Sequence, residues 1–337
     1  MDKTHVGALD ISPDEKPFVV VSPTMKTAMA SKNKNGTTGR KRKVIVRLKG
    51  GLGNQLFCYA AARRLALANG AELIIDDVTG FVRDRQYRRR YLLDRFHISA
   101  RKATPSERME PFERYRRGLV KFVEKHRAFR DRKYLEQEGI EFDPRLLNYE
   151  VKETVYLDGL WQSERYFKDI EAIIREDLRI VLPADERNRK IAEKIVSCNS
   201  VAVHVRWFDE PGPENTGGSY TLKRSYYACA IGEISAKVSQ PHFFLFSDNP
   251  VAARELIPLQ GDAITLVDHN EGEEQAYADL WFMTQCKHFI IANSTFSWWG
   301  AWLANTKSKL VIAPNIKLTG LTSWGFEGQV PEQWVLV

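Results

Sequence analysis

The sequence predicts an α/β protein built on parallel β-sheets that are covered by helices on both faces, and three observations support this. The 337 residues are 43% hydrophobic and 28% charged, which is ordinary for a globular chain long enough for one large or two medium domains. Short apolar strand patterns alternate with helical patterns along the chain. A strand, a glycine turn, a helix and a second strand near the start follow the order of a βαβ unit.

The N-terminal part divides into a tail and an ordered domain. Residues 1–42 show no sustained periodicity and become polar, glycine-containing and basic, so we expect a disordered basic tail. The run at 44–48 is a predicted strand. The Gly-rich turn at 50–53 and a helix with Asn54 as its N-cap follow it, and the next strand is predicted at 71–76.

The basic character of the chain is concentrated in residues 81–133, which contain 18 Lys or Arg against 7 Asp or Glu. This segment therefore carries +11, while the whole chain carries +7. We expect it to be mostly helical. Its charge favours a contact with nucleic acid, anionic lipid or a phosphorylated substrate, and a solvated helical surface is the alternative.

Two domains are predicted, an N-terminal one at 43–183 and a C-terminal one at 184–337, with the boundary near Pro183. The first also contains a predicted strand at 154–157 and a helix at 166–178. In the second, strands are predicted at 201–206, 243–246, 264–267, 288–292 and 309–313, with helices at 273–285 and from Ser294.

Several classes of protein are excluded by what the sequence lacks. No apolar run approaches the roughly 20 residues that a membrane-spanning helix needs, and the N-terminus lacks a secretory signal pattern. The four cysteines are far apart and form no Cys-x-x-Cys pair, so we expect neither a disulfide framework nor a cysteine zinc site. A protein of the reducing cytoplasm is expected.

Polar side chains follow several predicted strands, at the edge where open α/β sheets bind ligands. The turn at 50–55 reads Gly-Gly-Leu-Gly-Asn-Gln and precedes a helix N-terminus, an arrangement that favours an anion. Glycines needed for turn geometry alone are the alternative. On the strand at 201–206, alternation places His204 and Arg206 on one face, and the Arg206 fork suits two phosphate oxygens. A hydrogen-bonded core histidine is the alternative for His204.

Other side chains at this edge extend the pattern. Asp209 begins the loop after Arg206 and would serve as a base or hold that arginine in place. Asp248 follows the strand at 243–246, where a carboxylate can accept from a guanine edge or a ribose hydroxyl, or cap a helix. The segment 293–303 opens a helix with small hydroxyl residues and continues with tryptophans that we expect in the core. Together these groups predict one anion-binding cleft.

Several of these segments, in this order, resemble the α1,2-fucosyltransferases of glycosyltransferase family 11. The resemblance runs from about Val44 to Pro314 and rests on 50–57, 204–206 with Asp209, 246–248, 270–288 and 293–303. It implies an inverting, metal-independent transferase that uses GDP-β-L-fucose. The implied fold is GT-B-like, with two Rossmann-type domains whose parallel sheets face a cleft. The nucleotide sugar would bind the C-terminal domain and the acceptor the N-terminal one.

The resemblance also implies roles for individual residues. Arg206 is similar to the family arginine that grips the diphosphate and stabilises the leaving group, with His204 beside the nucleotide, and Asp209 is the candidate catalytic base. The remaining implied donor-binding residues are Asp248 at the guanosine, Ser294, Thr295 and Phe296 at the phosphate and base, and Gly51, Gly53, Asn54 and Gln55 over the sugar. Trp207 stands where the family usually has a second arginine, and Phe208 where a glycine is common.

These implications define the expected partners and the competing hypotheses. We expect GDP-fucose and a galactose-terminated, lipid-linked glycan acceptor, in a bacterial cytoplasmic enzyme whose basic segment lies against the anionic inner face of the membrane. No metal is expected: there is no Asp-x-Asp motif, and the loop at 268–271 is expected to be solvated. Trp207 keeps open a fold that binds nucleotide or glycan without turnover. An RNA-binding protein that uses residues 81–133 is the other alternative.

Overall fold

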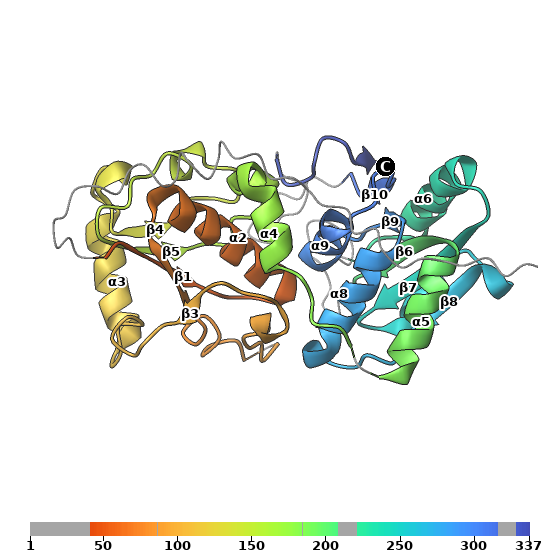
Figure 1. Ribbon diagram of the computed structural model, residues 1–337, viewed down its shortest axis with the longest axis horizontal. Helices are drawn as coiled ribbons and strands as arrows, with labels where there is room; N and C mark the ends of the chain where they lie inside the picture. The colour runs from red at the N-terminus through yellow and green to blue at the C-terminus, as the bar shows by residue number, and fades with distance from the viewer. Residues whose placement is uncertain (1–40, 86, 184, 208–220, 316–327) are drawn as a thin grey trace, which may run out of the picture. The chain divides into compact units, whose positions relative to one another are not determined.

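The computed structural model of the protein describes residues 41–85, 87–183, 185–207, 221–315 and 328–337. Nearly all of the predicted tail, and also Asp209 and Phe208, lie outside these residues. The described chain contains two sheets, one from each half, and every strand pair in both is parallel (Figure 1). This confirms the predicted α/β class, and two parallel α/β sheets in sequence are the architecture of a GT-B-like fold.

The N-terminal sheet has the strand order β3-β2-β1-β5-β4. The predicted strands are present, and two very short ones were missed, at both edges of this sheet. Its strands are β1 (Lys43–Arg47), β2 (Glu72–Asp76), β3 (Arg101–Lys102), β4 (Tyr134–Glu136) and β5 (Thr154–Asp158). Its helices and 3-10 turns are α2 (Leu52–Asn69), η1 (Leu93–Arg95), α3 (Glu113–Glu124), η2 (Phe129–Asp131), η3 (Pro144–Leu146), η4 (Glu164–Tyr166), η5 (Lys168–Ile170) and α4 (Glu171–Asp177).

The turn after β1 differs from the prediction in its cap. Gly50 adopts φ +76°, a left-handed conformation that suits glycine, and Gly51 is the extended N-cap of α2. The prediction of Asn54 as N-cap is therefore wrong. The side chain of Asn54 is instead used in contacts with Gln162 and Thr295, which the local sequence does not reveal.

The prediction that residues 81–133 are mostly helical is also wrong. Among the residues of this segment that the structure describes, only α3 is an α-helix, and the others form turns, short 3-10 segments, irregular chain and the two-residue strand β3. Helices cannot continue through Pro105 and Pro111, and Arg88 and Met109 adopt positive φ values. Arg101 and Lys102 pair with the carboxylates of Glu72 and Asp77, so tertiary ion pairs rather than helical propensity order this part of the segment.

The C-terminal sheet has the order β11-β10-β9-β6-β7-β8. Its strands are β6 (Asn199–Val205), β7 (Pro241–Ser247), β8 (Ile264–Val267), β9 (His288–Ile290), β10 (Val311–Ala313) and β11 (Val335–Leu336). Its helices and 3-10 turns are α5 (Glu186–Ser197), α6 (Arg224–Lys237), α7 (Pro250–Leu256), η7 (Gly261–Ala263), η8 (Glu273–Gln275), α8 (Ala276–Gln285) and α9 (Thr295–Leu303). Because the strands are parallel, their carboxyl ends lie at one edge.

An aromatic cluster joins the two halves, because α2 packs directly beside α9 (Figure 1). The ring of Phe57 on α2 lies 4.6 Å from that of Trp298 and 4.9 Å from that of Trp299. Phe167 stacks on Trp299 at 5.5 Å. Trp298 and Trp299 are fully buried and Trp302 is 3% exposed, which confirms the prediction that these tryptophans belong to the core.

Candidate functional site

The carboxyl ends of β6 and β7 bring Arg206 and Asp248 together. The two strands pair with Val205 opposite Ser247, so the next residues on each strand leave the sheet side by side. Nη1 of Arg206 donates to Oδ2 of Asp248, and the Trp207 backbone N–H donates to Oδ1 at 2.8 Å. Asp248 therefore holds both the guanidinium and the start of the following loop, while about a third of each side chain stays exposed.

His204 lies on β6, two residues before Arg206, and its side chain is 4% exposed. Its Nδ1 is 2.9 Å from Oγ of Ser297, and its ring is 5.5 Å from that of Phe296 on α9. Burial, assisted by the positive charge of Arg206, lowers the pKa of His204 to about 3. The imidazole is thus neutral at physiological pH, and it supplies a hydrogen-bonding ring rather than a second positive charge.

The start of α9 completes this side of the site. Ser294 is the N-cap, and its hydroxyl accepts from the Phe296 backbone N–H at 3.3 Å. The Ser297 hydroxyl accepts from the Ala292 backbone N–H, so it ties the helix start to the chain that follows β9. Hydroxyl residues therefore fix the direction of the first turn of α9 relative to His204.

The glycine turn of the N-terminal half meets this same helix start. A Cβ atom on Gly53 would lie 2.5 Å from the carbonyl carbon of Thr295 and 2.7 Å from the Phe296 backbone nitrogen. Nε1 of Trp299 donates to the Gly53 carbonyl at 3.0 Å. Only glycine permits this backbone contact, so Gly53 brings the two halves together at the site.

Asn54 bridges the two halves through its side-chain oxygen. That oxygen accepts from Nε2 of Gln162 at 2.8 Å and from Oγ1 of Thr295 at 3.1 Å. Gln55 is fully buried, and its amide donates to the carbonyls of Gly50 and Arg90 and accepts from a backbone N–H. The amide of Gln55 thus orders the turn and the chain that lies against it.

Two charged residues at this site were not singled out from the sequence. The guanidinium carbon of Arg89 lies 3.7 Å from the position of a Cβ on Gly51. Nε of Arg89 is buried and lacks a hydrogen-bond partner, and its nearest carboxylates, on Asp84 and Glu273, are 3.8 Å away. In the sequence, Arg89 is one of many arginines in residues 81–133, and no motif distinguishes it from the others. Glu273 lies within 270–288, but nothing in that segment singles it out.

Glu273 links Arg89 electrostatically to Arg206. Burial raises the pKa of Glu273, and the positive charges of Arg89 and Arg206 are among the influences that oppose the rise. One carboxylate thus lies within the field of two arginines, one from each half of the chain. An anion placed between these halves would find positive charge on both sides.

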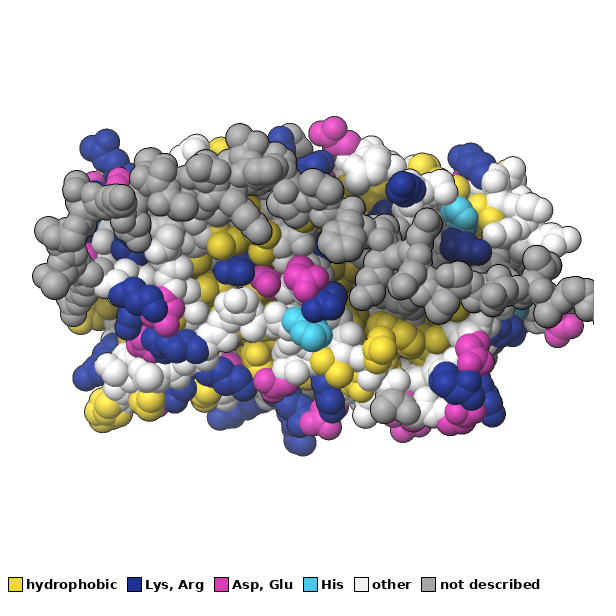
Figure 2. Space-filling view, viewed as in Figure 1, with side chains coloured by type: hydrophobic (Ala, Val, Ile, Leu, Met, Phe, Trp, Pro, Cys, Tyr) yellow, Lys and Arg dark blue, Asp and Glu magenta, His cyan; other side chains and the backbone are white. Residues whose placement is uncertain are grey.

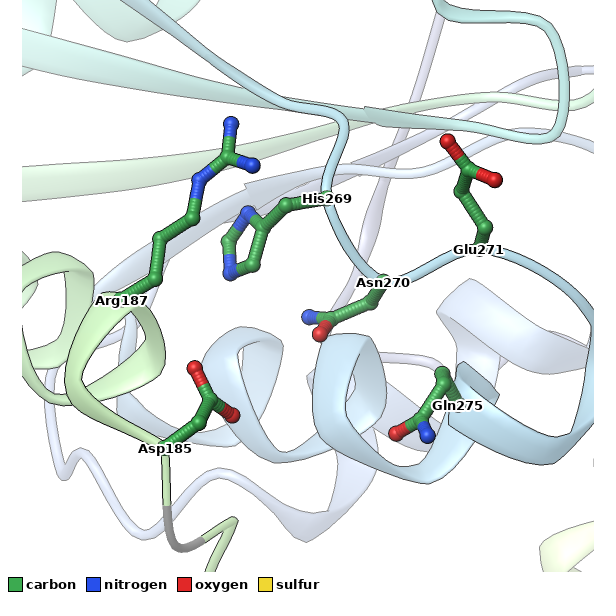
Figure 3. A pocket seen from close by; sticks show the side chains of 6 residues that line it. All are labelled: Asp185, Arg187, His269, Asn270, Glu271 and Gln275. Atoms are coloured by element: carbon green, nitrogen blue, oxygen red, sulfur yellow. The ribbon is translucent and has the colours of Figure 1, made fainter.

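A polar pocket of about 380 Å³ lies at the same sheet edge, beyond β8. Figure 3 shows Asp185 and Arg187 from the start of α5 on one side, His269 and Asn270 in the middle, and Glu271 with Gln275 on the other. These residues surround the loop at 268–271, for which a solvated loop is the expectation from sequence. Within the described ranges, no group of three or more His, Cys, Asp or Glu side chains has the arrangement of a metal site.

Asn270 connects this pocket to a buried carboxyl group. Its Nδ2 donates to Oδ1 of Asp279 at 2.8 Å and to Oδ1 of Asn188 at 3.1 Å, and Nε2 of His269 is 2.9 Å from the same Asn188 oxygen. Burial raises the pKa of Asp279 to about 7, opposed by the Asn270 hydrogen bond. The loop that contains Glu273 is therefore anchored on a titratable group.

The raised pKa of Asp279 predicts a pH-dependent stability. Between about pH 4 and pH 7 the unfolded chain has lost this proton while the folded chain retains it, so the free energy of unfolding falls as pH rises through that range. Asp279→Asn should abolish this decline, which amounts to roughly 3 kcal/mol between pH 5 and pH 8. Urea unfolding of both proteins at pH 5 and pH 8 measures it. Asp268→Asn, at a half-exposed neighbour, is the control, and equal slopes for all three proteins would contradict the prediction.

The structure thus brings most of the sequence-predicted site residues to one place. Gly53 and Asn54 contact the start of α9 directly, and Gly51 lies beside Arg89. His204, Arg206, Asp248 and Ser294 lie at the adjoining strand ends. Asp209 lies outside the described residues, so its assignment as base stays a prediction.

Comparison with known proteins identifies the family of the chain. The model of Glycosyl transferase family 11 matches residues 20–335. The chain belongs to this family. It is 29% identical over 312 residues to an alpha-1,2-colitosyltransferase of Escherichia coli, which covers 87% of this chain and 98% of that protein. It is also 29% identical over 287 residues to the O-antigen biosynthesis glycosyltransferase WbnK of Escherichia coli, with 79% and 92% covered.

Similarity of this family 11 chain to solved structures is more distant. A mutant of Arabidopsis thaliana FUT1 in complex with GDP is 13% identical, covers 90% of this chain and 76% of its own, and superposes with a TM-score of 0.49. The family match and the two curated relatives together make the chain a glycosyltransferase.

Proposed function

We propose that this glycosyltransferase moves L-fucose, with inversion, from GDP-β-L-fucose to O2 of a terminal galactose on a lipid-linked glycan. The observation that supports it most is the convergence of Arg206, neutral His204 and the start of α9 with the Gly53 turn of the other half. This arrangement offers positive charge and backbone N–H groups to a diphosphate. We also propose that the enzyme works without a metal, in the bacterial cytoplasm.

The proposed reaction forms one bond and breaks another at the anomeric carbon of fucose. The acceptor oxygen attacks C1 from the face opposite to GDP, the C1–O bond to the β-phosphate breaks, and its electron pair leaves with GDP. The acceptor proton passes to a base, for which Asp209 is the candidate. Negative charge grows on the β-phosphate in an oxocarbenium-like transition state, and Arg206 stabilises it.

In this proposal Arg89 supplies the second positive contact to the diphosphate, which an arginine at position 207 would otherwise supply. Trp207 has no charge, whereas Arg89 brings a guanidinium to Gly51 from the opposite half, with a buried Nε that lacks a hydrogen-bond partner. In the proposed complex the diphosphate replaces Glu273 as the anion between Arg89 and Arg206. Asp248 keeps the fork of Arg206 in position and is the proposed reader of guanosine.

A second donor is favoured by one comparison. The relative named as a colitosyltransferase suggests GDP-colitose, whose sugar is fucose without the hydroxyl at C3. Both sugars would be transferred from GDP, so the diphosphate site described above can bind either donor. Discrimination between the two donors depends on whether a polar group of the site hydrogen-bonds the C3 hydroxyl of fucose.

The donor and acceptor are tested together. The enzyme is incubated with GDP-fucose or GDP-colitose and a panel of galactose-terminated glycans, with GDP release and product linkage read by NMR. Transfer of fucose to O2 of galactose is the expected result. A preference for GDP-colitose would change the proposed donor, and a product with another linkage would change the proposed acceptor position. GDP binding without transfer to any acceptor would show a binding protein and not an enzyme. Retention on RNA without GDP binding would overturn the proposal.

Arg89→Met should weaken GDP binding by about 10- to 100-fold, because a charge-assisted hydrogen bond to phosphate contributes about 1.5 to 3 kcal/mol. GMP, which lacks the β-phosphate, should lose less affinity, so calorimetry with both nucleotides locates the contact. Arg90→Met is the matched control, because Arg90 is the next residue, is mostly exposed and pairs with Glu274. Equal GDP affinity of Arg89→Met and wild type would remove Arg89 from the donor site.

A further inference from the structure

Helix α3 is amphipathic, but the face that it packs against the protein is its charged one. Arg117 and Glu124, on one side of the helix, are 9% and 7% exposed. Tyr115, Leu119 and Phe122, on the other side, are 73%, 66% and 60% exposed. A surface helix of a globular protein normally buries its apolar stripe and exposes its charges, so α3 has the reverse arrangement.

Specific polar contacts hold the inner face of α3. Nη2 of Arg117 donates to the Thr79 hydroxyl at 2.8 Å and lies 3.4 Å from a carboxylate oxygen of Asp76. Nζ of Lys121 pairs with Asp158 at 2.9 Å, and Asp158 is 1% exposed. These contacts join α3 to the ends of β2 and β5. The helix is therefore fixed in this orientation, and rotation of the apolar stripe inward would leave buried charges unpaired.

The apolar stripe is continuous along the outer face. Phe112 precedes the helix and is 70% exposed, and Val123 is 51% exposed. Tyr115, Leu119, Phe122 and Val123 are spaced at intervals of three and four residues, which places them on one side of the α-helix, with Phe112 at its N-cap. Scattered exposed apolar residues are ordinary, whereas four on one face of a short helix, with a fifth at its N-cap, indicate an interaction surface.

Basic side chains border the stripe. Arg114, Arg116 and Lys125 are exposed, and Nζ of Lys125 lies 5.1 Å from the centre of the Phe122 ring. Yellow apolar and dark blue basic side chains lie together around the lower end of α3 in Figure 2, where α3 is placed as in Figure 1. Aromatic and aliphatic side chains flanked by Lys and Arg are the composition of a helix that lies in the interface of an anionic membrane.

We propose that α3 is an interfacial membrane anchor, with Phe112, Tyr115, Leu119, Phe122 and Val123 inserted among the acyl chains of an anionic bilayer. Arg114, Arg116 and Lys125 extend their charged ends to the lipid phosphates. This surface is independent of the donor site, and it would hold the enzyme where a lipid-linked acceptor lies. Among the described residues, no helix has the length and apolar character needed to cross a bilayer.

The positive charge around the stripe favours an anionic membrane over a second copy of the chain or the N-terminal tail as its binding partner. A second copy of the chain would place the same basic residues opposite one another in a symmetric contact, at a repulsive cost. Residues 1–40 contain 6 Lys or Arg and 4 Asp or Glu, so they too bring net positive charge to a segment that already carries +11. An anionic lipid surface offers both the missing negative charge and the apolar layer.

Vesicle sedimentation of the full chain tests the proposal. We expect binding to phosphatidylcholine vesicles that contain phosphatidylglycerol and little binding to phosphatidylcholine alone. Leu119→Ser with Phe122→Ser should weaken partitioning about tenfold. Replacing Arg114, Arg116 and Lys125 with Gln should weaken it about a hundredfold, since each charge near the surface contributes about a factor of five. Thermal melting should be unchanged in both variants, because all five side chains are exposed.

The matched control is Val251→Ser, which removes a 76% exposed apolar side chain from α7 in the other half. It should bind vesicles like wild type. Insertion is read separately with Leu119→Trp, whose added fluorescence should be quenched by brominated lipid. Equal vesicle binding of wild type and the Leu119→Ser, Phe122→Ser variant would overturn the proposal, and so would the absence of any vesicle binding by wild type. A concentration-dependent dimer that this variant breaks, or retention of the protein on RNA and not on vesicles, would also overturn it. GDP binding by each variant should equal that of wild type, so a failure here leaves the proposed function standing.

Discussion

Arg206→Ala should lower kcat for sugar transfer by about a hundredfold or more, the effect of removing a key donor to a developing anion. The guanidinium lies at the carboxyl end of β6, where Asp248 holds it and its side chain is 28% exposed. Its stabilisation of GDP increases as the C1–O bond breaks, so the loss should fall more on kcat than on the dissociation constant of GDP-fucose. Steady-state rates of GDP release together with calorimetry of donor binding give both quantities.

Two further variants make this result specific. Arg206→Lys keeps the charge but replaces the planar fork with a point charge, and it should recover only part of the rate. Arg189→Ala removes an exposed arginine that pairs with Glu186 and Glu193 on the same helix, and it should leave kcat unchanged. Near-normal turnover by Arg206→Ala would show that the leaving group is stabilised elsewhere in the site.

Gly53→Ala should destabilise the folded protein by roughly 3 kcal/mol, the upper range of overpacking effects, and should reduce donor binding with it. The new methyl group would lie 2.5 to 2.7 Å from backbone atoms of Thr295 and Phe296, which cannot rotate away as a side chain can. Moving α9 to relieve the overlap would also break the hydrogen bond from Trp299 to the Gly53 carbonyl. Urea unfolding and GDP calorimetry measure the two effects.

Gly232→Ala is the matched control for this substitution. Gly232 lies inside α6, and no heavy atom lies within 4 Å of its added Cβ beyond its own helix and immediate chain neighbours. Alanine is a better helix former than glycine by about 1 kcal/mol, so this variant should be slightly stabilised. Wild-type stability of Gly53→Ala would mean that α2 and α9 separate readily in solution.

The described fold follows the sequence most closely in its C-terminal half. The strand predicted at 264–267 has those bounds in the structure, and the helical pattern at 273–285 forms η8 and α8. Long apolar runs bounded by polar turns have one compatible environment, a sheet covered on both sides, so local pattern and tertiary structure agree. The resemblance to family 11 fucosyltransferases likewise pointed to the family that the whole-chain comparison confirmed.

Prediction failed where long-range contacts decide the conformation. The arginines of 81–133 are compatible with helix, but long-range pairs such as Arg101 with Glu72 and Lys43 with Glu107 hold much of that segment in other conformations. Arg89 could not be distinguished from its neighbours, because its importance depends on its nearness to Gly51 and Glu273. The reversed orientation of α3 was also hidden, since helical periodicity identifies an apolar face without saying which face is buried.

The amino-acid sequence by itself determined the class of fold, the core tryptophans of α9 and the neighbourhood of His204 and Arg206. Each of these depends on periodicity or on a compact motif within a few residues. Only the tertiary structure decided that Gly53 packs against the backbone of Thr295, that Arg89 faces the site from the opposite half, and that α3 exposes its apolar side. The reason is physical: these features depend on distances between segments far apart in the chain, and local propensities do not encode such distances.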